Sequence, residues 1–166
     1  MSDTVRSEAD VPVAYTPTGG YVGAMPEPIL AGCGDPLVDG APDLRGVWEV
    51  TALEVDGRPA PADHPAWQHT ERIEQAADRI VITGGGVVHD FRADGVLEHG
   101  VHDVMAADHV TPIHVTANFE DEMLVLRPEA MPDVVVRRWR AGAALVFSYA
   151  GLFEATMQRT DGTETS

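Results

Sequence analysis

The sequence contains no lysine, so its 11 basic residues are all arginines, and they stand against 27 acidic residues. The formal net charge of -16 argues against nucleic acids and anionic membranes as partners, because both bind clustered positive charge. Long hydrophobic runs are also absent, since no apolar stretch approaches the roughly 18 residues that a membrane-spanning helix needs. We therefore expect a protein that binds neither nucleic acid nor membrane.

Cysteine is scarce as well. Cys33 is the only one, which excludes an intrachain disulfide and is compatible with a reducing compartment. Residues 30–33 (Leu-Ala-Gly-Cys) have the form of a bacterial lipidation signal, but such a signal needs a positively charged start and a continuous apolar stretch. Residues 1–29 contain four prolines and the acidic Glu8, Asp10 and Glu27, and no such stretch. We predict a cytoplasmic protein.

Residues 1–43 differ in composition from the rest of the chain. They hold six of the 12 prolines, six glycines, seven acidic residues and one arginine. No helical or strand periodicity persists there, which predicts an extended arm that precedes the folded domain. Two placements are open for this arm: a lid over the mouth of the domain, or a patch on its outer wall.

From residue 44 to residue 160 the chain consists of about ten short runs in which apolar and polar residues alternate, separated by turn signals. No long helix lies between them, and parallel strands would need crossovers of a dozen or more residues, so the pairing should be antiparallel. Closure into a barrel removes the exposed edges of such a sheet. The sequence predicts an all-β domain, a closed antiparallel up-and-down barrel of about 8–10 strands, with residues 161–166 as a polar tail.

The first run contains Gly46-x-Trp48, and the last run ends on Arg159. A Gly-x-Trp on the first strand and an arginine closing the last strand resemble the calycin superfamily, which comprises lipocalins, fatty-acid-binding proteins and their bacterial relatives. The resemblance implies that the first and last strands pair, and that the arginine lies over the tryptophan at one end of the barrel.

Alternation along each strand predicts which side chains face the barrel interior, because successive residues point to opposite faces. With Trp48 and Arg159 pointing inward, the interior should also receive His89, Phe91, Phe119, Arg137, Trp139, Phe147, Tyr149 and Met157. Residues 96–105 are expected to form one strand, and its more apolar register brings His99 and Asp103 inward. A bulge at Gly100 would undo that register.

An apolar interior with a few polar groups is typical of a small-molecule pocket. We therefore predict that the barrel binds a small, mainly hydrophobic organic molecule. Its polar anchors would be Arg137, Tyr149, His89 and His99, and its apolar contacts Trp139, Phe147, Phe91, Phe119 and Met157. The alternative is an interior packed entirely by side chains. No cofactor is predicted, and a homodimer is left open.

Two other functions compete with simple binding. A histidine beside a carboxylate, His99 or His89 with Asp103, could perform acid–base catalysis. Several calycin-like barrels of bacterial secondary metabolism are cofactor-free cyclases or isomerases, which is what the resemblance implies for an enzyme. Relatives called nitrobindins bind haem through one histidine, yet residues 134–159 contain none. A metal site is not predicted, because the spacing of His89 and His99 supplies no third ligand.

Overall fold

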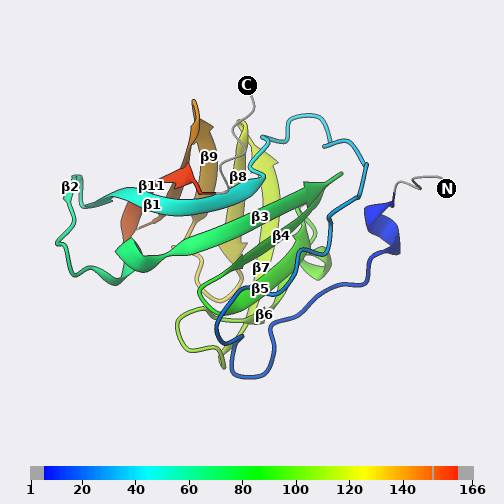
Figure 1. The fold of residues 1–166 in the computed structure, drawn as a ribbon, viewed down its shortest axis with the longest axis horizontal. Helices are drawn as coiled ribbons and strands as arrows, with labels where there is room; N and C mark the ends of the chain where they lie inside the picture. Colours follow the sequence, from blue (N-terminus) through cyan, green and yellow to red (C-terminus); the bar gives the residue numbers. More distant parts are fainter. Residues whose placement is uncertain (1–5, 151, 161–166) are drawn as a thin grey trace.

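The computed structural model describes residues 6–150 and 152–160. Eleven strands form one antiparallel sheet that curls into a nearly closed barrel (Figure 1). The strands are β1 (Gly46–Val55), β2 (Arg58–Pro59), β3 (Thr70–Ala76), β4 (Arg79–Gly84), β5 (Val87–Arg92), β6 (Val101–Val104), β7 (Pro112–Glu120), β8 (Met123–Pro128), β9 (Val136–Ala141), β10 (Ala144–Tyr149) and β11 (Phe153–Arg159). Three short 3-10 helices accompany them: η1 (Glu8–Asp10), η2 (Pro65–Gln68) and η3 (Leu97–His99). The predicted polar tail, residues 161–166, lies outside the described residues.

The strands follow one another around the barrel in the order β5-β4-β3-β1-β11-β10-β9-β8-β7-β6, with β2 paired to β1. The first long strand pairs with the last one, and Trp48 lies opposite Arg159 in that ladder. This pairing confirms the up-and-down barrel that the sequence predicts. Within the described chain, however, β5 and β6 share no hydrogen-bonded ladder, so the sheet has an opening between these two strands.

Trp48 and Arg159 close one end of the barrel in the way that the calycin resemblance implies. The Trp48 ring is fully buried and its Nε1 donates a hydrogen bond to the Leu44 carbonyl. The Arg159 guanidinium lies 5.3 Å from the centre of that ring. Gly46 has a φ of 143°, and a Cβ there would come within 3.0 Å of Arg159 Nε, so a side chain at this position would push the arginine off the ring.

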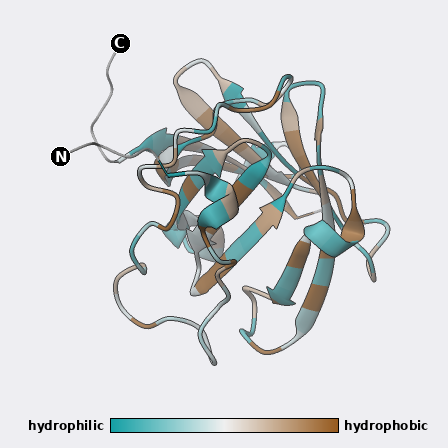
Figure 2. Cartoon of the chain, turned by 90° about the vertical axis from the view of Figure 1, so that its right-hand side faces the viewer, coloured by the Kyte–Doolittle hydropathy of each residue, from teal (hydrophilic) through white to brown (hydrophobic). Residues whose placement is uncertain are grey.

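The strands are coloured in alternating hydrophobic and hydrophilic bands, as a half-buried sheet requires (Figure 2). β4 is the exception, because all six of its residues are buried. Its inward residues Ile80 and Ile82 belong to the barrel core, while its outward Val81 belongs to a second, smaller core. Something must therefore cover the outer face of this strand.

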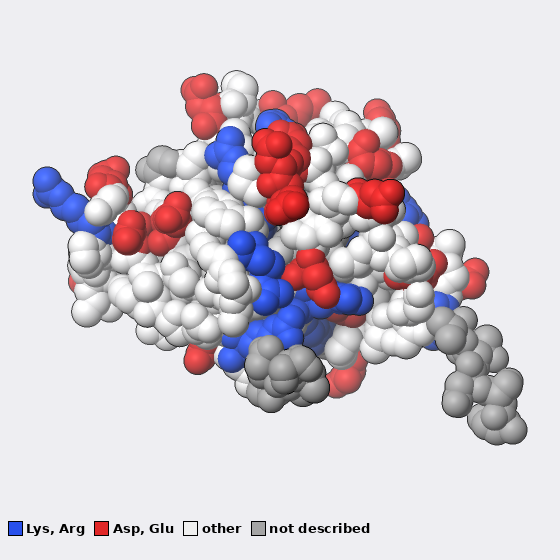
Figure 3. All heavy atoms as spheres, turned by 90° about the horizontal axis from the view of Figure 1, so that it is seen from above, with Lys and Arg blue, Asp and Glu red and all other residues white. Residues whose placement is uncertain are grey.

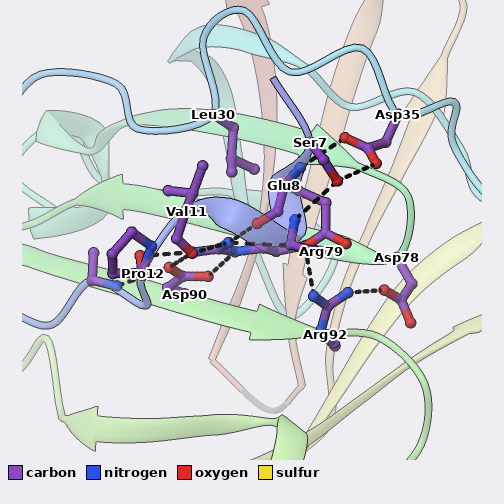
Figure 4. Close-up of polar contacts among 12 residues, drawn as sticks. Ser7, Glu8, Val11, Pro12, Leu30, Asp35, Asp78, Arg79, Asp90 and Arg92 are labelled. Carbon is purple, nitrogen blue, oxygen red and sulfur yellow. Dashed lines mark hydrogen bonds and ion pairs between the residues drawn. The ribbon is translucent and has the colours of Figure 1, made fainter. Parts of the chain in front are cut away.

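The N-terminal arm, here residues 6–43, provides that cover. It runs along the outside of β3, β4 and β5 (Figure 1), and its Val11 and Leu30 pack with Val81 and Val88 of the sheet. Arg79 of β4 fixes the arm by donating hydrogen bonds of 2.6–3.0 Å to Asp90 and to the carbonyls of Glu8, Val11 and Pro12 (Figure 4). The arm lies on the outer wall of the barrel.

The expectation of one strand over residues 96–105 is wrong. The chain forms η3 and then β6, with Gly100 between them. Gly100 is pressed against β7, since a Cβ there would come within 1.8 Å of the Val115 carbonyl oxygen. This close approach requires glycine and interrupts the alternation of side chains at the point where the sequence allowed for a bulge.

Candidate ligand-binding cavity

The half of the barrel away from Trp48 contains a cavity of about 330 Å³. Strands β3 to β10 contribute to its lining, and most of the lining side chains are apolar, among them Ile82, Val87, Val101, Ile113, Val115 and Leu126. The other half is packed, with Trp48, Leu145 and Met157 fully buried in the core. The barrel is thus neither hollow throughout nor filled throughout.

The cavity reaches the surface beside the loop that joins β6 to β7. Ala106 and Ala107 of this loop are exposed and also line the cavity, as does Leu152 in the turn between β10 and β11. His109 anchors the loop to the neighbouring hairpin by a 2.7 Å hydrogen bond from Nε2 to the Gly85 carbonyl. Small side chains at the mouth leave a route by which a ligand could pass.

Three charged or polar side chains on the cavity wall form one hydrogen-bonded group, which we call the polar trio: His69, Glu71 and Arg138. Arg138 donates from Nε to Glu71 Oε2 at 2.8 Å and from Nη2 to Glu71 Oε1 at 3.0 Å. His69 Nε2 donates to the same Oε1 at 2.7 Å. Glu71 is fully buried, so these bonds replace its hydration.

The polar trio holds Glu71 in its ionised form. Burial alone raises the pKa of this carboxyl, but the positive charge of Arg138 and the hydrogen bond from His69 outweigh burial and bring the pKa to about 2. Because an ionised carboxylate can only accept, His69 Nε2 must carry the hydrogen in this bond. The remaining ring nitrogen of His69, Nδ1, makes no hydrogen bond to any residue within the described ranges.

Aromatic rings complete this wall of the cavity. The Arg138 guanidinium lies over the Phe147 ring at 4.1 Å, and the His69 ring is 5.6 Å from the same ring. Tyr149 follows on the same face of β10 and also lines the cavity. The predicted inward positions of Phe147 and Tyr149 are confirmed by this lining, and their roles toward a ligand stay predictions.

His89 also lines the cavity, from β5. Its Nε2 donates to the Val104 carbonyl of β6 at 2.9 Å, so the side chain ties together the two strands that border the opening. Burial lowers the pKa of His89, which favours the neutral ring. The inward direction predicted for His89 is therefore correct.

The inward face predicted for β9 is wrong by one residue. Val136 and Arg138 line the cavity, and Arg137 and Trp139 do not. The β9–β10 ladder places Arg138 opposite Phe147 and Val136 opposite Tyr149, and residues directly opposite each other share a face. A two-residue turn at 142–143 sets this register, and this turn could have given the correct face from the sequence.

The predicted pairing of His99 with Asp103 is also wrong. His99 is exposed in η3 and bonds Asp94 at 2.6 Å, away from the barrel cavity. Asp103 accepts a hydrogen bond of 3.0 Å from the backbone of Thr16 in the arm. Because η3 replaces the expected strand, the two side chains no longer share one face, and neither of them lines the cavity.

Three of the predicted apolar contacts occupy the packed part of the barrel. Phe91 and Met157 belong to its core and Phe119 packs against it, so their inward direction is as predicted. None of the three lines the cavity. The sequence-based prediction also missed His69, Glu71 and Arg138. The sequence did contain a signal for Glu71: it lies two residues before Ile73 on the same strand, so an inward Ile73 places the Glu71 carboxylate on the inward face as well.

In the part of the chain that the structure describes, no group of three His, Cys, Asp or Glu side chains is arranged to hold a metal ion. The two cavity histidines each use Nε2 in a hydrogen bond, His69 to Glu71 and His89 to Val104. A haem iron would have to displace one of these bonds or bind Nδ1. Across the same residues, no helix is long and apolar enough to cross a membrane.

No protein-family model matches the chain. No curated protein matches it either. Solved structures do: human cRBP IV superposes with a TM-score of 0.50 at 15% sequence identity, over 71% of this chain and 98% of that one. At this identity the likeness establishes the fold, a calycin-like antiparallel barrel, and nothing finer.

Proposed function

We propose that this protein binds a small, mainly hydrophobic organic molecule in the barrel cavity. The observation that carries the proposal is the cavity itself, about 330 Å³ of space inside a barrel whose other half is tightly packed. Folded proteins rarely keep apolar voids of this size, because each void forfeits packing and hydrophobic stabilisation. A cavity with apolar walls and a few convergent polar groups is typical of a ligand site.

Two further features support this function. The cavity has a mouth lined by small side chains, Ala106 and Ala107, so a ligand need not be trapped during folding. The similar fold of human cRBP IV, a cellular retinol-binding protein, is consistent with hydrophobic ligands in a barrel of this shape. That likeness reaches only the fold, so the ligand has to be sought through the chemistry of the cavity wall.

The direct test is native mass spectrometry of the purified protein with added 1-octanol, together with displacement of the neutral fluorescent probe Nile red. Binding at a 1:1 ratio is expected. Ile113→Trp, which fills the cavity, should weaken it by about tenfold or more. Val110→Trp is the matched control, because Val110 is 70% exposed and does not line the cavity. Equal binding by both variants, or none by the natural sequence, would refute the proposal.

The polar trio supports one second candidate, a cofactor-independent cyclase or isomerase. Glu71 orients His69 by a 2.7 Å hydrogen bond, and His69 is one of the residues that line the cavity. A histidine held by a buried carboxylate is a common acid–base arrangement. His69 and Glu71 thus take the place that the sequence-based prediction gave to His99 and Asp103.

Turnover separates the two candidates. An enzyme would convert a bound substrate into a new product, and His69→Gln would abolish that conversion while leaving a bound complex detectable by mass spectrometry. A binding protein would release its ligand unchanged, and the same variant would alter only affinity. His99→Gln is the matched control, because His99 is half exposed and outside the cavity.

A further inference from the structure

The charges on the cavity wall cancel each other. Glu71 is ionised and fully buried, and Arg138, only 7% exposed, meets it through two parallel hydrogen bonds. The two groups come from β3 and β9, which are not neighbours in the sheet, so their hydrogen bonds join two separate parts of the barrel wall. Such a pair has no net charge, so the guanidinium is already neutralised before any ligand arrives.

The polar trio nevertheless keeps some hydrogen-bonding capacity. Arg138 uses Nε and Nη2 for Glu71, and its Nη1 group donates to no described residue. His69 uses Nε2 for Glu71 and leaves Nδ1, which is an acceptor in the neutral ring. Three N–H donors of Arg138 and one acceptor of His69 therefore remain on two side chains that line the cavity. A hydroxyl group matches both, because its oxygen accepts and its hydrogen donates.

A ligand carboxylate matches this wall poorly. It would place a second negative charge next to Glu71, and one guanidinium cannot neutralise two buried carboxylates. Its oxygens could accept from Arg138 Nη1, but they have no hydrogen to give to His69 Nδ1. The net charge of the whole chain, -16, adds a long-range repulsion of anions.

From this geometry we infer that the cavity selects a neutral ligand that carries a hydroxyl group, and rejects the corresponding carboxylic acid. The hydroxyl lies between His69 and Arg138 while the hydrocarbon part occupies the apolar remainder of the cavity. Glu71 is a specificity-determining residue, because its charge keeps Arg138 from binding an anion. The inference rests on the proposed function, since it names the ligand class of the same cavity.

The test compares 1-octanol with octanoate at pH 8, where an ordinary imidazole is neutral and octanoate is ionised. Displacement of Nile red gives both affinities. The natural sequence should prefer 1-octanol by about tenfold or more. Glu71→Gln frees the guanidinium, so octanoate should gain about tenfold or more relative to 1-octanol. The double variant Glu71→Gln with Arg138→Gln should lose this gain. Glu154→Gln, an exposed strand glutamate, is the control for the change of one charge.

Each outcome has one meaning. The inference is supported if the natural sequence prefers 1-octanol and Glu71→Gln reverses that preference. Octanoate binding as tightly as 1-octanol to the natural sequence overturns it and leaves the proposed function standing. If neither 1-octanol nor octanoate binds, both the inference and the proposed function are overturned. If Glu71→Gln does not fold, the comparison on the natural sequence decides alone, because it requires no variant.

Discussion

Glu71 is the residue on which the polar side of the cavity depends. Its carboxylate accepts all three hydrogen bonds of the polar trio, and none of its surface is exposed. A buried ion pair adds little net stability over apolar packing. Removing one partner, however, leaves the other charge buried without compensation and lowers the free energy of unfolding by about 3–5 kcal/mol. The main contribution of Glu71 is therefore to compensate the buried positive charge of Arg138.

Lowering the pH should decrease the stability that the ionised Glu71 carboxylate contributes to the folded protein. The pKa of Glu71 in the folded protein, about 2, lies below its ordinary value of 4.5. The stabilisation linked to the ionised carboxylate is therefore complete above pH 4.5 and is lost as the pH falls toward 2. Over that range it amounts to about 3 kcal/mol. We expect urea unfolding to show a difference between the natural sequence and Glu71→Gln that is largest near neutral pH and shrinks in acid.

The control for this experiment is Glu154→Gln, since Glu154 is exposed on β11. This variant should follow the natural sequence at every pH. A difference between the natural sequence and Glu71→Gln that stays constant from neutral pH to about pH 3 would contradict the depressed pKa.

At the scale of elements, the arm depends on Arg79. The guanidinium of this residue lies between β4 and the arm, and its hydrogen bonds with Asp90 raise the pKa of Arg79. Glu8 extends the contact, because it pairs with Arg92 of β5. The three arm carbonyls that Arg79 also binds belong to residues 8, 11 and 12. The planar guanidinium can reach all these partners together, whereas a lysine ammonium cannot.

Arg79→Lys should therefore loosen the arm and leave the cavity intact. The measurement is limited proteolysis with chymotrypsin, which cleaves after Tyr15 and Tyr21 once the arm detaches. Cleavage is expected to be about tenfold faster in this variant, corresponding to a weakening of about 1.4 kcal/mol. Affinity for 1-octanol should not change, because no arm residue in the described range lines the cavity. Arg58→Lys is the control, since Arg58 is exposed on β2.

A result in which Arg79→Lys leaves cleavage unchanged would mean that the apolar contacts of Val11 and Leu30 hold the arm without the arginine. A result in which ligand affinity falls with faster cleavage would mean that the arm acts on the cavity through β4 and β5. Either outcome would change the present view of the arm as an outer cover.

At the scale of the whole molecule, the barrel is open between β5 and β6 and carries a large negative charge. The arm bridges the opening, since Thr16 bonds Val88 of β5 through its hydroxyl and Asp103 of β6 through its backbone N–H. Acidic side chains are spread over the face seen in Figure 3, while basic side chains gather near its centre. Self-repulsion of this charge opposes the compact state.

Salt should therefore stabilise the protein. Raising the ionic strength from about 0.01 M to about 1 M shortens the Debye length from about 30 Å to about 3 Å, which screens repulsion among exposed carboxylates. We expect the melting temperature to rise over this range at neutral pH. Sodium chloride is compared with potassium chloride, so that an effect common to both reports screening. A fall in melting temperature would show that the exposed ion pairs contribute more than the repulsion costs.

The sequence by itself determined most of the strands and their antiparallel pairing, and its resemblance to calycins implied the closed end of the barrel. Period-2 alternation with glycine and proline turns marks most of the strands, and Trp48 lies opposite Arg159 because β1 and β11 pair. The strands depend on local pattern, which is why they can be read without coordinates. The inward direction of Phe147, Tyr149 and His89 follows in the same way.

Only the tertiary structure decided which side chains meet on the polar wall and where the arm lies. The side chains of a strand alternate between its two faces, so an error of one residue in the register of β9 turns every side chain to the opposite face. For this reason Arg137 and Trp139 were predicted to face inward, whereas Arg138 does so. Glu71 and Arg138 lie 67 positions apart, and only the curl of the barrel brings them within 2.8 Å. The glycine contact at Gly100 likewise depends on β7, a distant strand. Packing between distant segments sets such contacts, and alternation along a single strand carries no record of it.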